Sequence, residues 1–151
     1  MKKIRLLFFW VIFLLPFLQS CSDNKVEADL ATQVSGAYSL EEISFYNGAD
    51  ILRPNPPLGT VGFRGGDLII VKETENSCKI TLNSINITSA TGQVVSSTTP
   101  ATNTIALSRS SQNGNNIIGA VNTITLTFGG TIATMVTSTN TTNTKYTFKK
   151  K

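Results

Sequence analysis

Two regions of very different hydrophobicity make up this chain. Residues 6–18 read LLFFWVIFLLPFL without a charge, whereas apolar and polar positions alternate from residue 36 onward. Alternation with a period of two is typical of β-strands that bury one face, and no segment after Ser35 has a helical period. We therefore expect a short apolar N-terminal segment followed by an all-β domain.

Tight turns separate the alternating segments. Asn-Gly and Gly-Gly pairs favour two-residue hairpins, because both central residues can adopt positive φ. We count eight or nine strands, which short loops would join into an up-and-down meander. The expected strands are 37–46, 58–63, 67–73, 78–90, 93–98, 103–109, 116–128, 131–139 and 145–150.

Two of these strands change phase part-way along. The apolar residues change parity at Glu41-Glu42 in the first strand and at Asn83-Ser84 in a later one. A bulge at each point would return all the apolar side chains to one face. Bent strands favour a coiled sheet or a barrel. The predicted fold class is therefore an all-β antiparallel meander of about eight strands that forms a barrel, with a β-sandwich as the alternative.

One long irregular loop interrupts the predicted strands at Arg53-Pro54-Asn55-Pro56-Pro57. Proline cannot donate a hydrogen bond to a sheet, so we expect this loop to cross an open end of the barrel. A weaker hypothesis makes the same loop the inhibitory segment of a protease inhibitor.

The apolar segment at the start has the features of an export signal. Its thirteen residues follow three basic residues among the first five. A helix that spans a bilayer needs ~20 apolar residues, so the segment is too short. A basic start, a short apolar run and a small residue after it are typical of a secretory signal peptide. We expect residues 1–20 to be the signal peptide and 21–35 to be a flexible tether with one helical turn.

Leu18-Gln19-Ser20-Cys21 resembles the lipobox of bacterial lipoproteins. Leu18, Ser20 and Cys21 match that pattern, while Gln19 replaces the small or branched residue that is usual there. The resemblance implies a diacylglyceryl thioether on Cys21, cleavage before it, and acylation of the new amine by a chain such as palmitate. Each buried methylene contributes ~0.8 kcal/mol, so three chains would anchor the protein in a membrane.

The segment that follows Cys21 bears on location. Ser22-Asp23-Asn24 loosely resembles an acidic surface-export signal of some Gram-negative bacteria. The resemblance implies an outer-membrane lipoprotein that faces the periplasm or the cell surface.

Removal of the signal peptide lowers the net charge of the protein, and the net charge of the remaining chain is the one that bears on function. The whole chain has 13 Lys+Arg and 9 Asp+Glu, and three of the basic residues leave with the signal, so the net charge falls from +4 to +1. A nearly neutral domain gives no electrostatic basis for binding nucleic acid. Lipidation of Cys21 would leave Cys78 without a disulfide partner, and we expect Cys78 in the core.

Residue types that most enzymes and metal sites need are scarce. The chain has no His, which removes the usual general base and most zinc sites. Glu73 and Glu75 could share a strand face at a spacing that glycosidases use, but a hairpin end favours a solvated role. We therefore predict no enzyme activity, no catalytic residue, no metal and no cofactor.

The β domain, residues 36–151, resembles the lipocalins at both of its ends. Gly36-Ala37-Tyr38 is similar to the Gly-x-Trp that opens the first lipocalin strand, and Tyr146-Thr147-Phe148-Lys149 is similar to the closing strand. Small lipocalin-like lipoproteins of Gram-negative bacteria share this layout. Tyr38 replaces the Trp, and no Arg stands near the last strand as its partner.

This resemblance implies an eight-stranded barrel whose mouth can hold one small apolar ligand. The candidates for lining the cavity are Tyr38, Phe45, Phe63 and Phe128. One alternative is a barrel filled by its own side chains. Another is a surface structural or adhesion module that binds an unknown protein or a glycan, for which we expect an exposed apolar patch or an unpaired edge strand.

Overall fold

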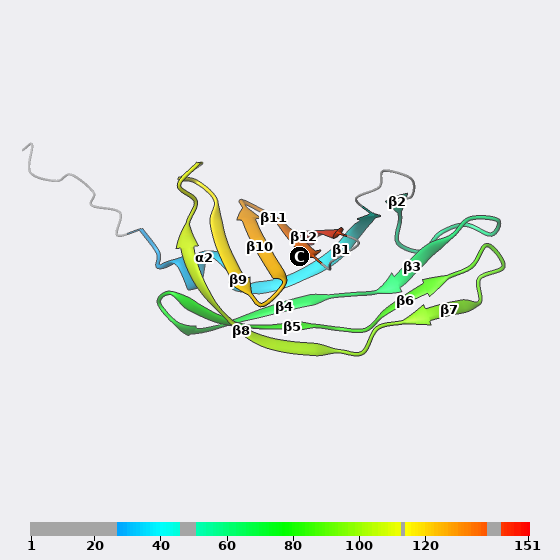
Figure 1. Cartoon of the computed structure of the whole chain (residues 1–151), viewed down its shortest axis with the longest axis horizontal. Helices are drawn as coiled ribbons and strands as arrows, with labels where there is room; N and C mark the ends of the chain where they lie inside the picture. The colour runs from blue at the N-terminus through cyan, green and yellow to red at the C-terminus, as the bar shows by residue number, and fades with distance from the viewer. Residues whose placement is uncertain (1–26, 46–50, 113, 139–142) are drawn as a thin grey trace, which may run out of the picture.

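The computed structural model describes residues 27–45, 51–112, 114–138 and 143–151, and the predicted signal peptide and Cys21 lie outside them. The described elements are one helix and twelve strands (Figure 1). Their bounds are α2 (Leu30–Val34), β1 (Gly36–Phe45), β2 (Ile51–Leu52), β3 (Gly62–Gly65), β4 (Leu68–Thr74), β5 (Ser77–Leu82), β6 (Ile85–Thr88), β7 (Val94–Ser97), β8 (Ala101–Arg109), β9 (Ile117–Val121), β10 (Ile124–Gly129), β11 (Ile132–Ser138) and β12 (Asn143–Lys150).

Eight strands form a closed antiparallel barrel. Their order, β1-β4-β5-β8-β9-β10-β11-β12, follows the chain, and β12 pairs back onto β1. Closure removes the free sheet edges along the barrel. The predicted meander is therefore confirmed as a lipocalin-like barrel, and the β-sandwich alternative is wrong.

The bulge predicted in the first strand is present. The register between β1 and β12 shifts between Leu40 and Glu42. Tyr38, Leu40 and Ile43 are all buried, although regular alternation would turn Ile43 away from the other two. The bulge therefore keeps both halves of β1 facing the core.

A second sheet of three strands continues the barrel at one end. We call β3, β6 and β7 the extension. β3 precedes β4, β6 follows β5 and β7 precedes β8, and the order β3-β6-β7 repeats the order of their barrel neighbours. Figure 1 shows the extension at the end of the molecule opposite α2. The phase change predicted at Asn83-Ser84 is thus the junction between β5 of the barrel and β6 of the extension.

Two sequence expectations about turns were wrong. Residues 116–128 form the hairpin β9–β10 and not one strand, with Asn122 at φ 51° in the turn. Asn tolerates this left-handed conformation better than most residues do. Gly65-Gly66, one of the Gly-Gly pairs expected to form hairpins, instead lies at the end of β3, where the chain passes into β4, and both residues have positive φ.

The segment with the three prolines runs along the extension. We call residues 53–61 the proline loop. Pro54 forms a parallel bridge with Phe63 of β3. Asn55 N donates to Phe63 O at 2.9 Å, and Phe63 N donates to Arg53 O at 3.1 Å. The loop is therefore fixed as an additional short edge of the extension.

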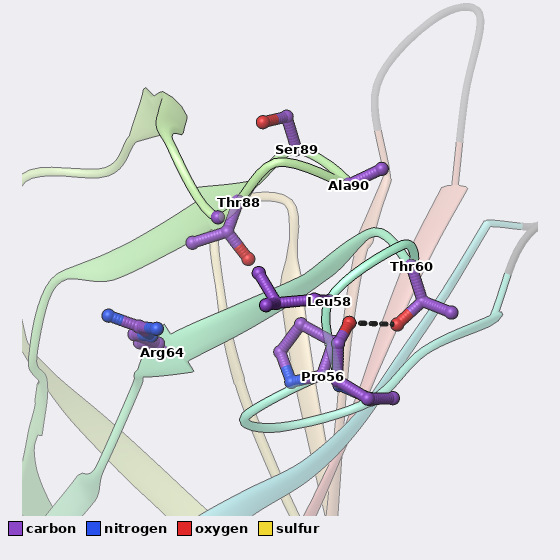
Figure 2. A pocket seen from close by; sticks show the side chains of 9 residues that line it. Pro56, Leu58, Thr60, Arg64, Thr88, Ser89 and Ala90 are labelled. Atoms are coloured by element: carbon purple, nitrogen blue, oxygen red, sulfur yellow. Dashed lines mark hydrogen bonds between the residues drawn. The ribbon is translucent and has the colours of Figure 1, made fainter.

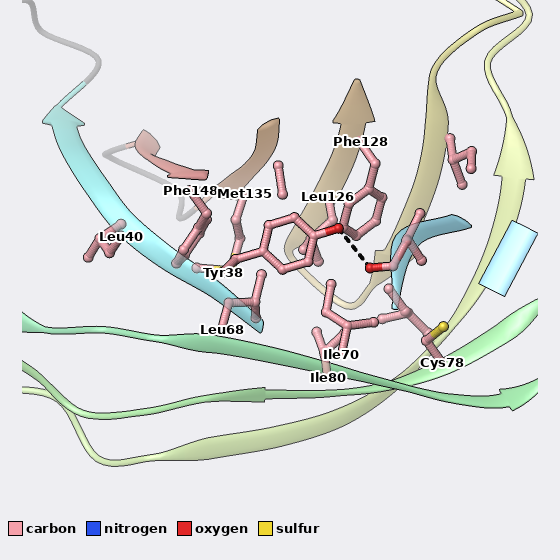
Figure 3. Packing of buried hydrophobic residues seen from close by; sticks show 14 of the residues in the cluster. Tyr38, Leu40, Leu68, Ile70, Cys78, Ile80, Leu126, Phe128, Met135 and Phe148 are labelled. Atoms are coloured by element: carbon pink, nitrogen blue, oxygen red, sulfur yellow. Dashed lines mark hydrogen bonds between the residues drawn. The ribbon is translucent and has the colours of Figure 1, made fainter. Parts of the chain in front are cut away.

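The barrel core is filled by apolar side chains from all around the sheet. Figure 3 shows Tyr38 near the centre, with Phe148, Met135, Leu126 and Phe128 on one side and the β4 and β5 side chains on the other. The lone described cysteine, Cys78, is buried in this core as expected.

Helix α2 covers the end of the barrel away from the extension. It begins after Asp29, whose side chain accepts a hydrogen bond from Thr32 N, as an N-cap does. Ala31 and Val34 are buried, and Ala31 N donates to Glu75 O in the β4–β5 turn. The last part of the predicted tether is therefore folded against the barrel.

The junction between β3 and β4 yields a prediction about stability. A Cβ on Gly65 would lie 2.6 Å from the backbone oxygen of Ser84, whereas a Cβ on Gly92 would meet nothing closer than 4.0 Å. Their φ values, 79° and 81°, are nearly equal, so both substitutions carry the same left-handed strain. We expect Gly92→Ala to lower the free energy of unfolding by about 1 kcal/mol, and Gly65→Ala by a further 1–3 kcal/mol, roughly the cost of overpacking.

Urea unfolding of the two variants and the wild type measures this difference. Equal losses in Gly65→Ala and Gly92→Ala would show that the close approach of the two backbones at the junction does not contribute to stability.

Candidate functional site

Two of the four candidate cavity residues lie together inside the barrel. The ring centroids of Tyr38 and Phe128 are 6.3 Å apart with the planes at 57°, and both side chains are buried. Tyr38 Oη donates to Val34 O at 2.7 Å. Burial raises the pKa of the Tyr38 hydroxyl to about 12, so it stays protonated as a donor. These two rings therefore pack against each other beside α2 (Figure 3).

The third candidate, Phe63, lies outside the eight-stranded barrel. It belongs to β3 of the extension, is fully buried, and is paired in register with Ile87 of β6. The structure thus does not bring all four candidates into one cavity, and their role in ligand binding stays a prediction.

The fourth candidate, Phe45, lines an open groove where the barrel meets the extension. The groove has a volume of about 500 Å³. We call it the apolar groove, and it is lined by Phe45, Ile51, Leu52, Thr60, Val61 and Ile87.

Four segments that are separate in sequence build this groove. Phe45 ends β1, and β2 pairs with β1 so that Leu52 lies opposite Ile43. The proline loop brings Val61 back beside them, and Ile87 comes from β6. An ion pair of 2.9 Å between Arg53 and Glu42 connects the start of the proline loop to β1. The pairing of β2 with β1 brings the same part of the chain beside Ile43 and Ser44.

The groove exposes apolar side chains to solvent. Ile51 is 57% exposed and Val61 is 51% exposed, while Leu52 is buried below them. Exposed apolar clusters of this kind mark binding sites more often than isolated apolar residues do. Among the described residues that line the groove, the one polar side chain is Thr60, whose hydroxyl already donates to Pro57 O at 2.8 Å. The groove therefore offers apolar contact and little hydrogen bonding.

None of the titratable groups with a perturbed pKa is among the described residues that line the groove. The hydrogen bond from Lys72 and that from Thr32 N lower the pKa of Asp29 to about 2. Burial raises the pKa of the Cys78 thiol and of the Tyr146 hydroxyl. Within the part of the chain that the structure describes, no three His, Cys, Asp or Glu residues come together as a metal site.

An exposed sheet edge is the second surface feature of the extension. β7 lies at the edge of its sheet and is exposed along its length, and it presents Val94 and Val95 to solvent. This is the kind of edge that the adhesion alternative predicts. That alternative stays a prediction.

Sequence reasoning missed most of the groove. It identified Phe45 but not Ile51, Leu52, Val61 or Ile87. The apolar pair Ile51-Leu52 immediately before the proline loop is the one sequence signal that could have drawn attention to it. Ile87 gives no such signal, because its place in the apolar alternation is the same for a core residue as for a residue that lines a groove.

Comparison of the chain with models of known protein families and with curated proteins finds no match. Among the described residues, no helix is both long enough and apolar enough to cross a membrane.

Proposed function

We propose that this protein is an outer-membrane lipoprotein, anchored through Cys21 and facing the periplasm or the cell surface, that binds a small apolar ligand in the apolar groove. The observation that carries the ligand proposal is the groove itself, about 500 Å³ with exposed Ile51 and Val61 on its wall. This volume lies within the ~300–1,000 Å³ that is usual for small-molecule sites.

The geometry of the two ends supports this arrangement. Glu27, six residues after Cys21, forms an ion pair with Arg109 at the end of β8 that lies away from the extension. α2 covers the same end, as Figure 1 shows. An anchor at Cys21 would therefore leave the groove on the far side of the barrel, turned toward the aqueous compartment. The ligand would then arrive from solution and not from the lipid.

Binding in this groove would rest on the hydrophobic effect. A ligand that covers Phe45, Ile51 and Val61 gains roughly 25 cal/mol for each Å² of apolar surface removed from water. The polar atom of Thr60 keeps its partner, Pro57 O, so an apolar ligand leaves no hydrogen bond broken there. The proposal includes no catalytic step, because the described lining side chains are those of five apolar residues and this threonine.

The anchor is tested at its attachment point. Cys21→Ala is expected to abolish incorporation of labelled palmitate, because the thiol that would accept the lipid is gone. Cys78→Ala is the matched control, since it removes the other cysteine of the chain and should label as the wild type does. Labelling that persists in Cys21→Ala would show that the lipobox proposal is wrong.

Two exposed valines provide the test of the groove. Val61 lies in the groove, whereas Val71 lies on β4 of the barrel, and they are 51% and 55% exposed. We expect Val61→Ser to weaken binding of the neutral apolar fluorophore N-phenyl-1-naphthylamine to the full chain roughly fivefold, because apolar contact is lost. Val71→Ser should leave the affinity for this fluorophore unchanged.

Fluorescence titration of the wild type and both variants gives the three affinities. Equal affinity in Val61→Ser and the wild type would contradict the groove as the binding site. An equal loss in Val61→Ser and Val71→Ser would show binding to exposed apolar residues in general.

A further inference from the structure

A second, smaller hollow lies between the proline loop and β6, and it shares one lining residue, Thr60, with the apolar groove. Its volume is about 100 Å³, and its walls include Pro56, Leu58, Arg64, Thr88 and Ala90. Figure 2 shows Thr88 and Ala90 on one side of this hollow and the proline-loop residues Pro56 and Leu58 on the other. Arg64, from β3, also lines it.

Thr88 carries an unusual hydroxyl. The residue is 1% exposed, and Thr88 Oγ1 is the one buried side-chain nitrogen or oxygen without a hydrogen-bond partner among the residues that the structure describes. Figure 2 shows this oxygen directed toward Leu58 and Pro56. Buried polar atoms in folded proteins are nearly always hydrogen-bonded, and an exception calls for a specific explanation.

Gly62 of β3 allows the proline loop to lie close to Thr88. Thr88 lies opposite Gly62 in the β3–β6 register. A Cβ on Gly62 would lie 2.6 Å from Pro56 Cγ and 2.5 Å from Arg53 O, so only glycine allows the proline loop to approach this closely. The loop therefore covers the Thr88 hydroxyl with proline and leucine side chains, which offer it no hydrogen bond.

Arg64 supplies a charge to the same hollow. It follows Gly62 by two residues and so lies on the same face of β3. Of the three described arginines, Arg53 is paired with Glu42 and Arg109 with Glu27, whereas Arg64 forms no ion pair with a described residue. Glu41 and Asp67 line a neighbouring hollow with Arg64 but do not form an ion pair with it, and Asp67 is paired with Lys151 at 2.8 Å.

We propose that this hollow binds the carboxylate of a short-chain organic acid. The planar guanidinium of Arg64 matches a carboxylate in shape and charge. Once the exposed side chain of Leu58 turns aside, the Thr88 hydroxyl donates a hydrogen bond to the same carboxylate, and this satisfies the buried oxygen. Pro56, Leu58 and Ala90 contact the alkyl chain. The small volume limits the ligand to acids of the size of acetate, propionate or butyrate.

This site goes beyond the apolar groove and does not depend on it. None of the described residues that line the groove is charged, whereas this hollow combines a guanidinium that has no ion pair with a described residue and one unpartnered hydroxyl. The two sites therefore call for different ligands, and either can fail its test without affecting the other.

The test is a titration of the full chain, labelled with ¹⁵N in detergent micelles, with sodium butyrate. We expect saturable shifts of the amide resonances of Thr88, Ser89 and Gly92, which line the hollow. Thr88→Val and Arg64→Gln should each raise the dissociation constant about tenfold or more, because each removes a hydrogen bond to a charged group. Thr88→Ser keeps the hydroxyl and should keep most of the affinity.

Matched variants and a neutral analogue complete the design. Thr125→Val and Lys79→Gln change exposed residues on the barrel, in β10 and β5, and should leave butyrate binding unchanged. 1-Butanol has the same chain without the charge and should not give saturable shifts. Equal binding of butanol and butyrate, unchanged affinity in Thr88→Val or Arg64→Gln, or the absence of saturable shifts would each overturn the proposal.

Discussion

The pairing of β1 with β12 is the interaction on which the rest of the structure depends. It joins the first and last strands from Tyr38↔Lys150 to Phe45↔Thr144 and so closes the barrel. Lys150 adds a second contact at the α2 end, because its Nζ lies 5.7 Å from the centre of the Tyr38 ring and donates to Gln33 O at 3.3 Å. Gly36 makes room for it, since a Cβ there would lie 2.9 Å from Lys150 Cε. Closure thus fixes α2, the core and the first strand together.

The same closure positions the apolar groove and supports the strands from which the extension continues. β1 pairs with β12, β4 and β2, so its far end holds Phe45 and β2 in place beside the barrel mouth. The extension, in contrast, continues β4, β5 and β8 on the other side of that mouth. The apolar groove forms where the proline loop passes between these two parts, whereas the hollow at Thr88 lies between the proline loop and the extension itself. The barrel therefore acts as a rigid support, and the residues of the candidate binding sites lie mainly on its loops and on the extension.

The sequence predicted the barrel well and the sites poorly, and particular residues show why. A phase change such as Glu41-Glu42 is a local signal, so the bulge in β1 could be predicted. The same kind of phase change at Asn83-Ser84 marks the point where the chain passes from the barrel sheet to the extension. That outcome depends on strand partners that are far away in sequence. The Tyr38 ring has a lysine and not an arginine as its cationic partner, and only the register of β1 with β12 identifies Lys150. The Thr88 hydroxyl lacks a partner only because Gly62 admits the proline loop, a fact of packing that no local pattern contains.

Native-state hydrogen exchange of the β1 and β12 amides tests the central role of barrel closure most directly. If closure holds the fold together, these amides exchange only through global unfolding, and their opening free energy equals the free energy of unfolding measured in urea. The amides of the β9–β10 hairpin then open no less readily than those of β1 and β12. Opening of β1 and β12 at a clearly lower free energy, while β9–β10 stays protected, would contradict the account.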